Sequence, residues 1–421
     1  MKEKIRSLYA DTLFRNSFYL MLNTVVMAGL GFGFWLISAH LFSPSDIGIA
    51  SGLISAMALI SYVSLLGFNN TFVRVLPTST NRSTEINTGL LLSLLVAVVV
   101  AIGYLIAIPH IAPRLDLVNK NLFYSLGFIA LAVFATMNML TDSIFIALRA
   151  AKYNLLIDGG ITSGIKMLLP FVFVSLGAYG VFASAGVAAG FGMIASIIFL
   201  IYKFEYRPRL HIHRQTVRSI FHYSFASYLA NLLNIAPTLV LPLLIINRLG
   251  PAPAGYYYLA FMMANLLYAV AYSISQSLFA EGSYGDISLE KLARRSVVIL
   301  GVIMIPAALI LGAAGPFILQ IFGKSYGVEA SPVLITLSLA APAVAAYSIG
   351  NVLLRLRNKI YSIIAVNVVY FAGISGFAIL WVGKGLTWIG FAWIIGNVLA
   401  ALLSFILFYA DEQSRTVRTS V

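Results

Sequence analysis

The sequence contains no cysteine among its 421 residues, so it has neither a disulfide framework nor a thiolate metal site. Charged residues are also scarce. They make up 10% of the chain, whereas a soluble domain has about 25%. Hydrophobic residues make up 60%, above the roughly 45–50% of soluble domains. No stretch outside the apolar runs is long enough to form a separate core, which excludes a soluble enzyme or binding module.

Several motifs of known chemistry are missing as well. The chain has no Walker-type lysine motif, and no loop carries the paired aspartates that a metal-dependent transferase needs. Gly29, Gly31 and Gly33 lack the preceding strand of a dinucleotide site, so they indicate close helix packing in a membrane span. The pair Gly186 and Gly190 also indicates close helix packing. We therefore predict no cofactor and no metal.

Long apolar runs dominate the chain. A helix needs about 20 apolar residues to cross the hydrocarbon layer, which is roughly 30 Å thick. Twelve runs meet this length, at residues 17–41, 47–68, 86–108, 122–147, 155–176, 180–202, 224–247, 255–279, 297–319, 332–354, 360–383 and 389–409. The predicted fold class is an all-α polytopic membrane protein with twelve transmembrane helices.

The stretch at residues 41–77 is repeated in the second half of the chain. When the chain is aligned with itself at an offset of 207 residues, Pro44 aligns with Pro251 and Gly48 with Gly255, and no gap is needed. Matching turns between runs of equal length indicate an internal duplication. A membrane protein built from two similar halves is usually a transporter, because the substrate path can lie between the halves.

Lys and Arg residues are distributed unevenly between the loops on the two sides. With the N-terminus in the cytosol, 21 of the 27 lie on the cytosolic side, five lie outside, and one lies within a run. We therefore predict a multi-pass protein of the cytoplasmic cell membrane with both termini in the cytosol. Six runs in each half predict two pseudo-symmetric six-helix lobes. These are an N-terminal lobe at 1–202, a basic cytosolic linker at 203–222, and a C-terminal lobe with a short cytosolic tail at 223–421.

The net charge of +13 has a simple interpretation. It fits topological anchoring and attraction to anionic lipid headgroups. A loop between two membrane spans is a poor site for nucleic acid, so we expect membrane lipids as partners and no nucleic acid.

Three charged residues lie inside otherwise apolar runs, namely Asp142, Asp158 and Lys166. Each such charge costs about 2.5–3.5 kcal/mol at a helix centre by insertion scales, so it generally faces a bundle interior or a wet cavity. Lys166 and Asp142 are thus candidates for the substrate path. The alternative is that Lys166 forms an ion pair with an aspartate and only stabilises the packing of the helices. Asp158 lies near the cytosolic end of its run and is either a path residue or simply interfacial.

A second candidate group consists of uncharged amides in the opening helix pair of each half, Asn23, Asn231, Asn234, Asn265 and Gln276. Their amides would hydrogen-bond either to sugar hydroxyls or to one another across helices. Both interpretations remain open.

A third candidate group lies at the expected cytosolic mouth, where the chain places Arg15, Arg74, Arg149 and Lys152. Guanidinium groups there would suit a substrate phosphate. The alternative is that these cations only anchor the topology.

The segment LFSPSDIGIASGLISAMALISYVSLLGFNNTFVRVLP at residues 41–77 resembles the first helix hairpin of the polysaccharide biosynthesis flippases. These belong to the multidrug/oligosaccharidyl-lipid/polysaccharide (MOP) exporter superfamily. The matching features are the Pro44 turn, Gly48, the Leu66-Gly67-Phe68 end and Arg74, and RLGPAPAGYYYLAFMMANLL resembles the same hairpin in the second half. The resemblance implies two six-helix lobes around a cavity that opens alternately to the two sides. It also implies a cargo of lipid-linked oligosaccharide on a polyprenyl pyrophosphate carrier.

The resulting hypothesis is a transporter rather than an enzyme. We expect a flippase that moves lipid-linked oligosaccharide or polysaccharide repeat units from the cytosolic to the outer leaflet by alternating access. Its partners would be the polyprenyl-linked saccharide and other polysaccharide assembly proteins. Two alternatives stay open, a cation-coupled drug or metabolite antiporter and a membrane-embedded glycosyl or prenyl transferase.

Overall fold

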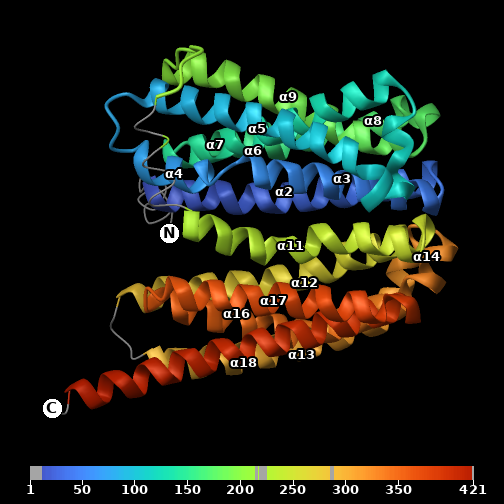
Figure 1. Cartoon of the computed structure of the whole chain (residues 1–421). Helices are drawn as coiled ribbons and strands as arrows, with labels where there is room; N and C mark the ends of the chain where they lie inside the picture. Colours follow the sequence, from blue (N-terminus) through green and yellow to red (C-terminus); the bar gives the residue numbers. More distant parts are fainter. Residues whose placement is uncertain (1–11, 214–216, 218–224, 285–288, 420–421) are drawn as a thin grey trace, which may run out of the picture. The chain divides into compact units, whose positions relative to one another are not determined.

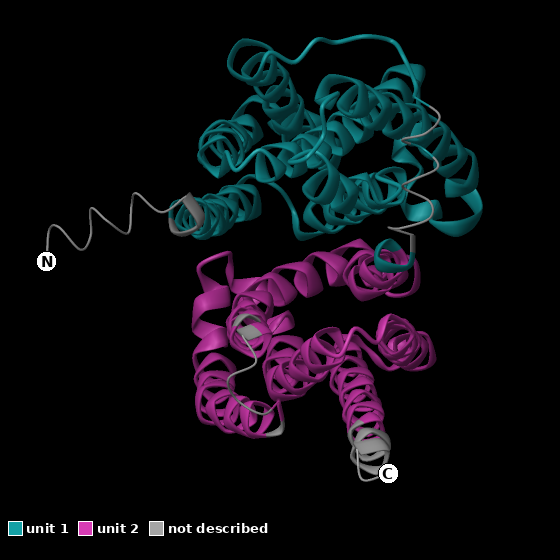
Figure 2. Cartoon of the chain, turned by 90° about the vertical axis from the view of Figure 1, so that its left-hand side faces the viewer, with its two compact units in different colours: residues 1–228 teal, residues 229–421 magenta. Residues whose placement is uncertain are grey.

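The computed structural model describes residues 12–213, 217, 225–284 and 289–419. Most of these residues are helical, and none of them forms a strand. The chain folds into two compact units, residues 1–228 and 229–421 (Figures 1 and 2). The lobe boundaries expected from the sequence stay a prediction, because residues 214–216 and 218–224 of the expected linker lie outside the described residues.

The helices have the following bounds. In unit 1 they are α2 (Thr12–Leu41), α3 (Pro44–Ser64), α4 (Phe68–Val75), α5 (Arg82–Ile111), η1 (Pro113–Asn119), α6 (Leu122–Ala147), α7 (Ala151–Asn154), η2 (Leu155–Thr162), α8 (Ser163–Val172), η3 (Val174–Leu176) and α9 (Ala178–Phe204). The remaining helices are α11 (Phe225–Arg248), α12 (Pro251–Tyr284), α13 (Leu289–Gln320), α14 (Lys324–Glu329), α15 (Ser331–Leu339), α16 (Ala341–Leu356), α17 (Ile360–Trp381), η4 (Val382–Lys384) and α18 (Leu386–Thr419).

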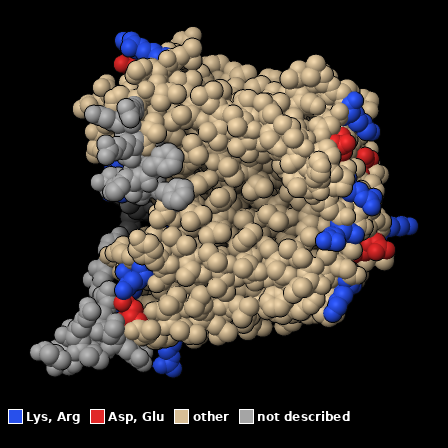
Figure 3. All heavy atoms as spheres, in the orientation of Figure 1, with Lys and Arg blue, Asp and Glu red and all other residues tan. Residues whose placement is uncertain are grey.

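The described residues contain twelve helical segments that are long and apolar enough to cross a membrane. This confirms the number of spans and the all-α fold class. Figure 3 shows the corresponding surface: Lys, Arg, Asp and Glu lie near the helix ends, and the band between the ends is almost free of charge. An uncharged band of this kind is what a lipid hydrocarbon layer requires.

The repeated hairpin begins and ends at equivalent positions in the two halves. Helix α2 ends at Leu41 and α3 begins at Pro44, whereas α11 ends at Arg248 and α12 begins at Pro251, so both boundaries differ by the predicted 207 positions. Ser43 caps α3, because its Oγ accepts a hydrogen bond of 3.1 Å from the Asp46 N–H. In the second copy Gly250, with φ +103°, precedes the proline instead.

The second span is shorter than its apolar run predicted. The expected helix continued to Phe68, but α3 ends at Ser64. Leu66 and Gly67 have φ values of +51° and +84°, which break the helix before α4 begins. The equivalent position in the second half is Ile274, and α12 runs through it to Tyr284. A left-handed conformation is available to glycine and costly for a β-branched residue, so only the first copy breaks.

Glycines bring α9 close to α6 in unit 1. A Cβ atom built on Gly186 would lie 2.6 Å from Leu131, and one on Gly190 would lie 2.8 Å from Phe134. The predicted close packing at this pair is therefore confirmed. It is also confirmed for Gly33, where a Cβ atom would lie 3.0 Å from Met167 Sδ on α8, but it was wrong for Gly29 and Gly31, because open space surrounds the Cβ position of each. Glycines in a span do not always mark a helix contact.

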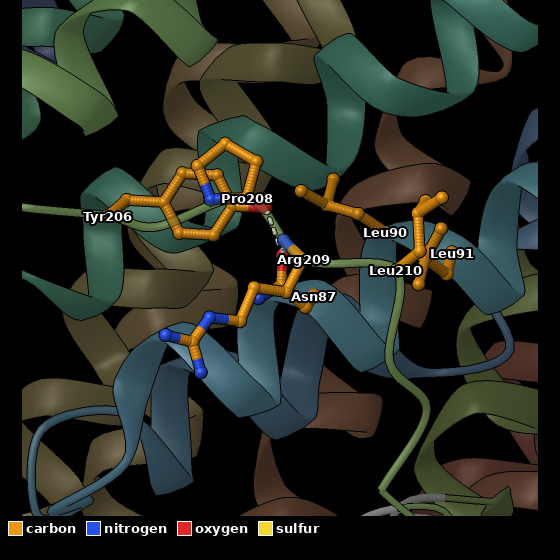
Figure 4. Close-up of a pocket in the computed structure, with 7 residues that line it drawn as sticks. All are labelled: Asn87, Leu90, Leu91, Tyr206, Pro208, Arg209 and Leu210. Atoms are coloured by element: carbon orange, nitrogen blue, oxygen red, sulfur yellow. Dashed lines mark hydrogen bonds between the residues drawn. The ribbon is translucent and has the colours of Figure 1, made fainter.

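The amide of Asn87, near the start of α5, accounts for three of the hydrogen bonds that hold the chain leaving α9 (Figure 4). Asn87 Nδ2 donates to the Arg207 carbonyl over 3.0 Å, and Asn87 Oδ1 accepts from the Tyr206 hydroxyl over 2.6 Å and from the Arg209 N–H over 3.0 Å. Burial raises the pKa of Tyr206 to about 12, so its hydroxyl remains a donor at neutral pH. The first residues of the expected linker are thus part of unit 1.

Candidate functional site

The two intramembrane aspartates meet in unit 1. Asp142 lies on α6 and Asp158 on η2, and their carboxyl groups are close neighbours. Asn138 Nδ2 donates to Asp158 Oδ1 over 3.0 Å, and Asn154 Nδ2 donates to the Asp142 carbonyl over 3.2 Å. We refer to Asn138, Asp142, Asn154 and Asp158 as the carboxyl cluster. Two neighbouring carboxylates repel each other, so a proton or another cation placed between them would relieve that repulsion.

The burial of Asp158 corrects one interpretation from the sequence. An interfacial carboxylate would be solvated, but Asp158 is only 3% exposed. The cause lies in the backbone, since Leu155–Thr162 forms a π-helix in which the turns are wider than in an α-helix. Ser163 Oγ also donates to the Asp158 carbonyl over 2.6 Å, which satisfies part of the widened turn. Short π-helical segments frequently occur at functional sites.

Three buried oxygen atoms around the carboxyl cluster have no hydrogen-bond partner among the described residues. They are Asn138 Oδ1, Asn154 Oδ1 and Thr162 Oγ1. Gly192 on α9 faces two of them, because a Cβ atom at this position would overlap Thr162 Oγ1 and Asn138 Oδ1. Buried acceptors without donors are costly, so their presence in the cluster calls for a functional explanation.

Lys166 lies on α8 and is partly buried. Its Nζ is 4.5 Å from the centre of the Phe34 ring on α2, which is cation–π geometry. Among the described residues Lys166 forms no ion pair with Asp142 or Asp158. The structure therefore does not contain the Lys–Asp pair that the sequence analysis gave as the structural alternative. The two aspartates are therefore neighbours of each other, and Lys166 lies over the face of the Phe34 ring.

The amides predicted as one group fall into three environments. Asn23 faces η2, since a Cβ atom on Gly159 would lie 2.9 Å from Asn23 Oδ1. Asn234 is in unit 2, where its Nδ2 donates to the Tyr347 hydroxyl over 2.7 Å. The other three, Asn231, Asn265 and Gln276, are exposed on the surface of the structure. No hydrogen bond between two of these five amides is found in the described part of the chain, and their place in the substrate path stays a prediction.

Asn234 belongs to a polar network that sequence reasoning did not identify. The Tyr347 hydroxyl donates to Asn367 Oδ1 over 2.8 Å, and Asn351 Nδ2 donates to the same oxygen over 2.9 Å. Asn367 Nδ2 donates to the Ala230 carbonyl over 2.8 Å. This network joins α11, α16 and α17, and its signal in the sequence is two asparagines placed in apolar helices.

The basic residues of the expected cytosolic mouth are only partly brought together. Arg15, Arg149 and Lys152 line one pocket, together with Lys203, which the sequence analysis did not single out. Arg74 is exposed on α4 and does not line that pocket. The role of Arg15, Arg74 and Arg149 in a substrate path stays a prediction.

The signal for the carboxyl cluster was present in the sequence. Asn138 and Asp142 are four positions apart, and so are Asn154 and Asp158. A spacing of four places both side chains on one face of a helix. Two such segments on successive spans predict a shared polar site, and the structure forms it.

Comparison with known proteins agrees with this architecture. Residues 37–331 match the family described as polysaccharide biosynthesis protein. No curated protein matches the chain. One similar solved structure is the inward-facing conformation of a multidrug resistance MATE family transporter of the MOP superfamily. It is 15% identical with a TM-score of 0.74, and the alignment covers 96% of this chain and 100% of that one.

Two further structures share the fold. The outward-facing conformation of a multidrug resistance MATE family transporter is 15% identical, with a TM-score of 0.61 and 96% of both chains covered. A MOP superfamily transporter from Pyrococcus furiosus, described as having a binding pocket of reverse polarity, is 15% identical, with a TM-score of 0.62 and 95% of both chains covered. The family and fold implied by residues 41–77 are thereby confirmed. The chain belongs to the polysaccharide biosynthesis protein family and has the fold of the MOP superfamily transporters.

Proposed function

We propose that this protein is a flippase that moves lipid-linked oligosaccharide or polysaccharide repeat units across the cytoplasmic membrane. The observation that carries the proposal is the match of residues 37–331 to the polysaccharide biosynthesis family, on a chain with twelve membrane spans. Polysaccharide synthesis needs saccharides that are assembled on one side of a membrane to be used on the other. A carrier with many spans and a buried polar site fits that need better than a transferase does.

The energetics of such a step are reasonable. An anionic headgroup that leaves a negative cytosol gains about 2.3 kcal/mol per charge for each 100 mV of membrane potential. This force acts on any lipid phosphate, whichever sugar it carries. In the proposed mechanism the two lobes rock about the substrate, and the saccharide passes through the polar interior while the lipid chain remains in the bilayer. Both termini would remain in the cytosol, and other polysaccharide assembly proteins would be partners.

A cation-coupled antiporter is the second candidate, and the carboxyl cluster favours it. The carboxyl groups of Asp142 and Asp158 are neighbours, and Asn138 Oδ1, Asn154 Oδ1 and Thr162 Oγ1 lie buried with no hydrogen-bond partner in the described part of the chain. An oxygen-only set of this kind suits a proton or a hard cation such as Na⁺. The carboxyl cluster is also compatible with a flippase whose transport is driven by a cation gradient.

Reconstitution separates these functions. The purified full-length protein is placed in lipid vesicles that contain a polyprenyl pyrophosphate saccharide with a fluorescent label, and dithionite is added outside. A flippase exposes label from both leaflets, so the fluorescence falls further than in protein-free vesicles. The recovered lipid should be chemically unchanged, which excludes a transferase.

The same vesicles test the antiporter. A gradient of protons or Na⁺ is imposed, and the efflux of a cationic dye is followed. Dye efflux without any change in lipid accessibility would replace the flippase with the antiporter. Equal bleaching with and without protein, in vesicles where the protein is folded, would also contradict the proposal.

A further inference from the structure

A basic pocket lies at one end of unit 1. It has a volume of about 460 Å³ and is formed where α2 begins, where α6 gives way to α7, and where α9 ends. This is the end of unit 1 at the left of Figure 1. The cations in its lining are Arg15, Arg149, Lys152 and Lys203. Segments far apart in the sequence thus bring positive charge to one hollow.

The charge of this basic pocket has one sign. Its described lining residues include four cations and no carboxylate, and all four cationic side chains are exposed. Like charges on one surface repel each other, so an anion placed among them lowers the electrostatic energy. Guanidinium and ammonium groups also supply several donors for the oxygens of a phosphate. Both charge and donor chemistry therefore suit a phosphate group.

The backbone holds Arg149 at the wall of the basic pocket. Its φ is +54°, in the left-handed region that residues other than glycine rarely adopt. The next N–H, of Ala150, donates to the Phe145 carbonyl over 2.8 Å. Asn16 Oδ1 accepts a hydrogen bond of 3.0 Å from the Ala151 N–H, which ties this turn to α2. These bonds form the left-handed turn that ends α6, and they fix the backbone of Arg149 relative to α2.

The position of the basic pocket at the ends of candidate membrane spans indicates that its ligand is a lipid. Arg15 is the first residue of one candidate span, Lys203 is next to the last residue of another, and Arg149 lies in the turn between two more. Tyr19 and Tyr153 add aromatic rings to the lining, and tyrosine is enriched where membranes meet water. A phosphate held at this level belongs to a headgroup.

We propose that the basic pocket binds the phosphate of a membrane lipid. Two lipids have the required chemistry. One is a resident anionic phospholipid, and the other is the pyrophosphate of a polyprenyl carrier, an identification that rests on the proposed function. In the second case the pocket is the place where the cargo headgroup first docks on unit 1.

Native mass spectrometry of the full-length protein tests the site. The probes are dioleoylphosphatidylglycerol, farnesyl pyrophosphate and inorganic pyrophosphate, with phosphatidylcholine as the zwitterionic reference. The variant Arg149→Gln/Lys203→Gln removes two cations of the basic pocket. The matched variant Arg207→Gln/Arg209→Gln removes two exposed cations just beyond α9, and it retains the bonds to Asn87, which use only the backbone of these residues. A third variant, Arg149→Lys/Lys203→Arg, conserves the charge.

We expect the pocket variant to retain about tenfold less anionic lipid than the wild type, because charge-assisted hydrogen bonds are lost. The matched variant and the charge-conserving variant should stay close to the wild type. Retention of phosphatidylglycerol alone identifies a resident lipid, retention of farnesyl pyrophosphate identifies the carrier, and competition by inorganic pyrophosphate shows that the headgroup suffices.

Two results would overturn the proposal. Equal losses in the pocket variant and the matched variant would reduce these cations to anchors, and loss of binding in the charge-conserving variant would show that charge is not what the site recognises. Because the assay measures binding without transport, its outcome is separate from that of the flippase assay. Selective lipid binding in a protein that moves no saccharide would contradict only the proposed function.

Discussion

Nδ2 of Asn138 donates a hydrogen bond of 3.0 Å to Oδ1 of Asp158 and thereby joins α6 to η2 inside unit 1. The relationship is reciprocal, because Asn154 of the second segment donates to the carbonyl of Asp142 in the first. Each asparagine thus holds the aspartate of the other segment. This crossing fixes the two carboxyl groups next to one another, and a change in charge on one of them must act on both spans.

The first prediction concerns this pair of carboxyl groups. The variant Asp158→Asn keeps the size of the side chain but removes one of the two neighbouring carboxyl groups. A buried polar group left without its partner costs about 1–3 kcal/mol, which corresponds to a rate loss of about fivefold or more if the same group acts in transport. We expect translocation in vesicles to fall by at least that factor under a proton gradient. The matched control is Asp116→Asn, an exposed aspartate in η1, which should keep the wild-type rate. Wild-type transport in Asp158→Asn would remove the carboxyl cluster from the mechanism.

The second prediction concerns Lys166. The variant Lys166→Met keeps a long apolar side chain and loses the charge, so we expect it to insert normally and to lose transport. Lys166→Arg retains both the charge and the contact with Phe34, and it should keep part of the activity. Transport is measured by the vesicle assay, and insertion is measured by the amount of folded protein in the membrane fraction.

Lys324 provides a control for the loss of one positive charge. It is exposed on α14, and Lys324→Met should leave the rate unchanged. Full activity in Lys166→Met would show that Lys166 serves only to pack α8 against α2.

The third prediction concerns orientation and uses the absence of cysteine from the natural chain. Single variants Thr80→Cys and Lys120→Cys place one thiol in the loop before α5 and one after η1, and both positions are exposed. With the N-terminus in the cytosol, the thiol at position 120 should react with a membrane-impermeant maleimide in intact cells. The thiol at position 80 should react only after the membrane is opened. The reverse pattern would invert the predicted topology.

The sequence predicted the features that depend on residues close together in the chain, and it missed those that depend on contacts between distant segments. Span number and the hairpin at Pro44 and Pro251 follow from local rules, namely apolar length and turn chemistry, and both were correct. The break at Gly67 was missed, because a single glycine in an apolar run does not show whether its left-handed conformation is used.

The candidate site was less predictable for the same reason. That Asp142 and Asp158 are unusual followed from their cost in lipid. That their carboxyl groups lie next to each other, and that Lys166 lies over Phe34, depended on the π-helix and on how α6, η2 and α8 pack. Tertiary packing decides which polar groups meet, and no local pattern near Asn234 indicated Tyr347 as its partner.

The last prediction concerns the polar network of unit 2. Asn367 makes three hydrogen bonds, to Tyr347, Asn351 and the Ala230 carbonyl, and these join α17 to α16 and α11. Hydrogen bonds between membrane helices average about 0.6 kcal/mol each, so Asn367→Leu should destabilise the protein by about 2 kcal/mol and lower Tm by roughly 5 °C. The measurement is thermal unfolding in detergent. The control is Ser375→Ala on the same helix, because the Ser375 hydroxyl is buried without a hydrogen-bond partner among the described residues. Its loss should leave Tm nearly unchanged. An equal drop in both variants would mean that α17 is held by packing volume rather than by the amide of Asn367.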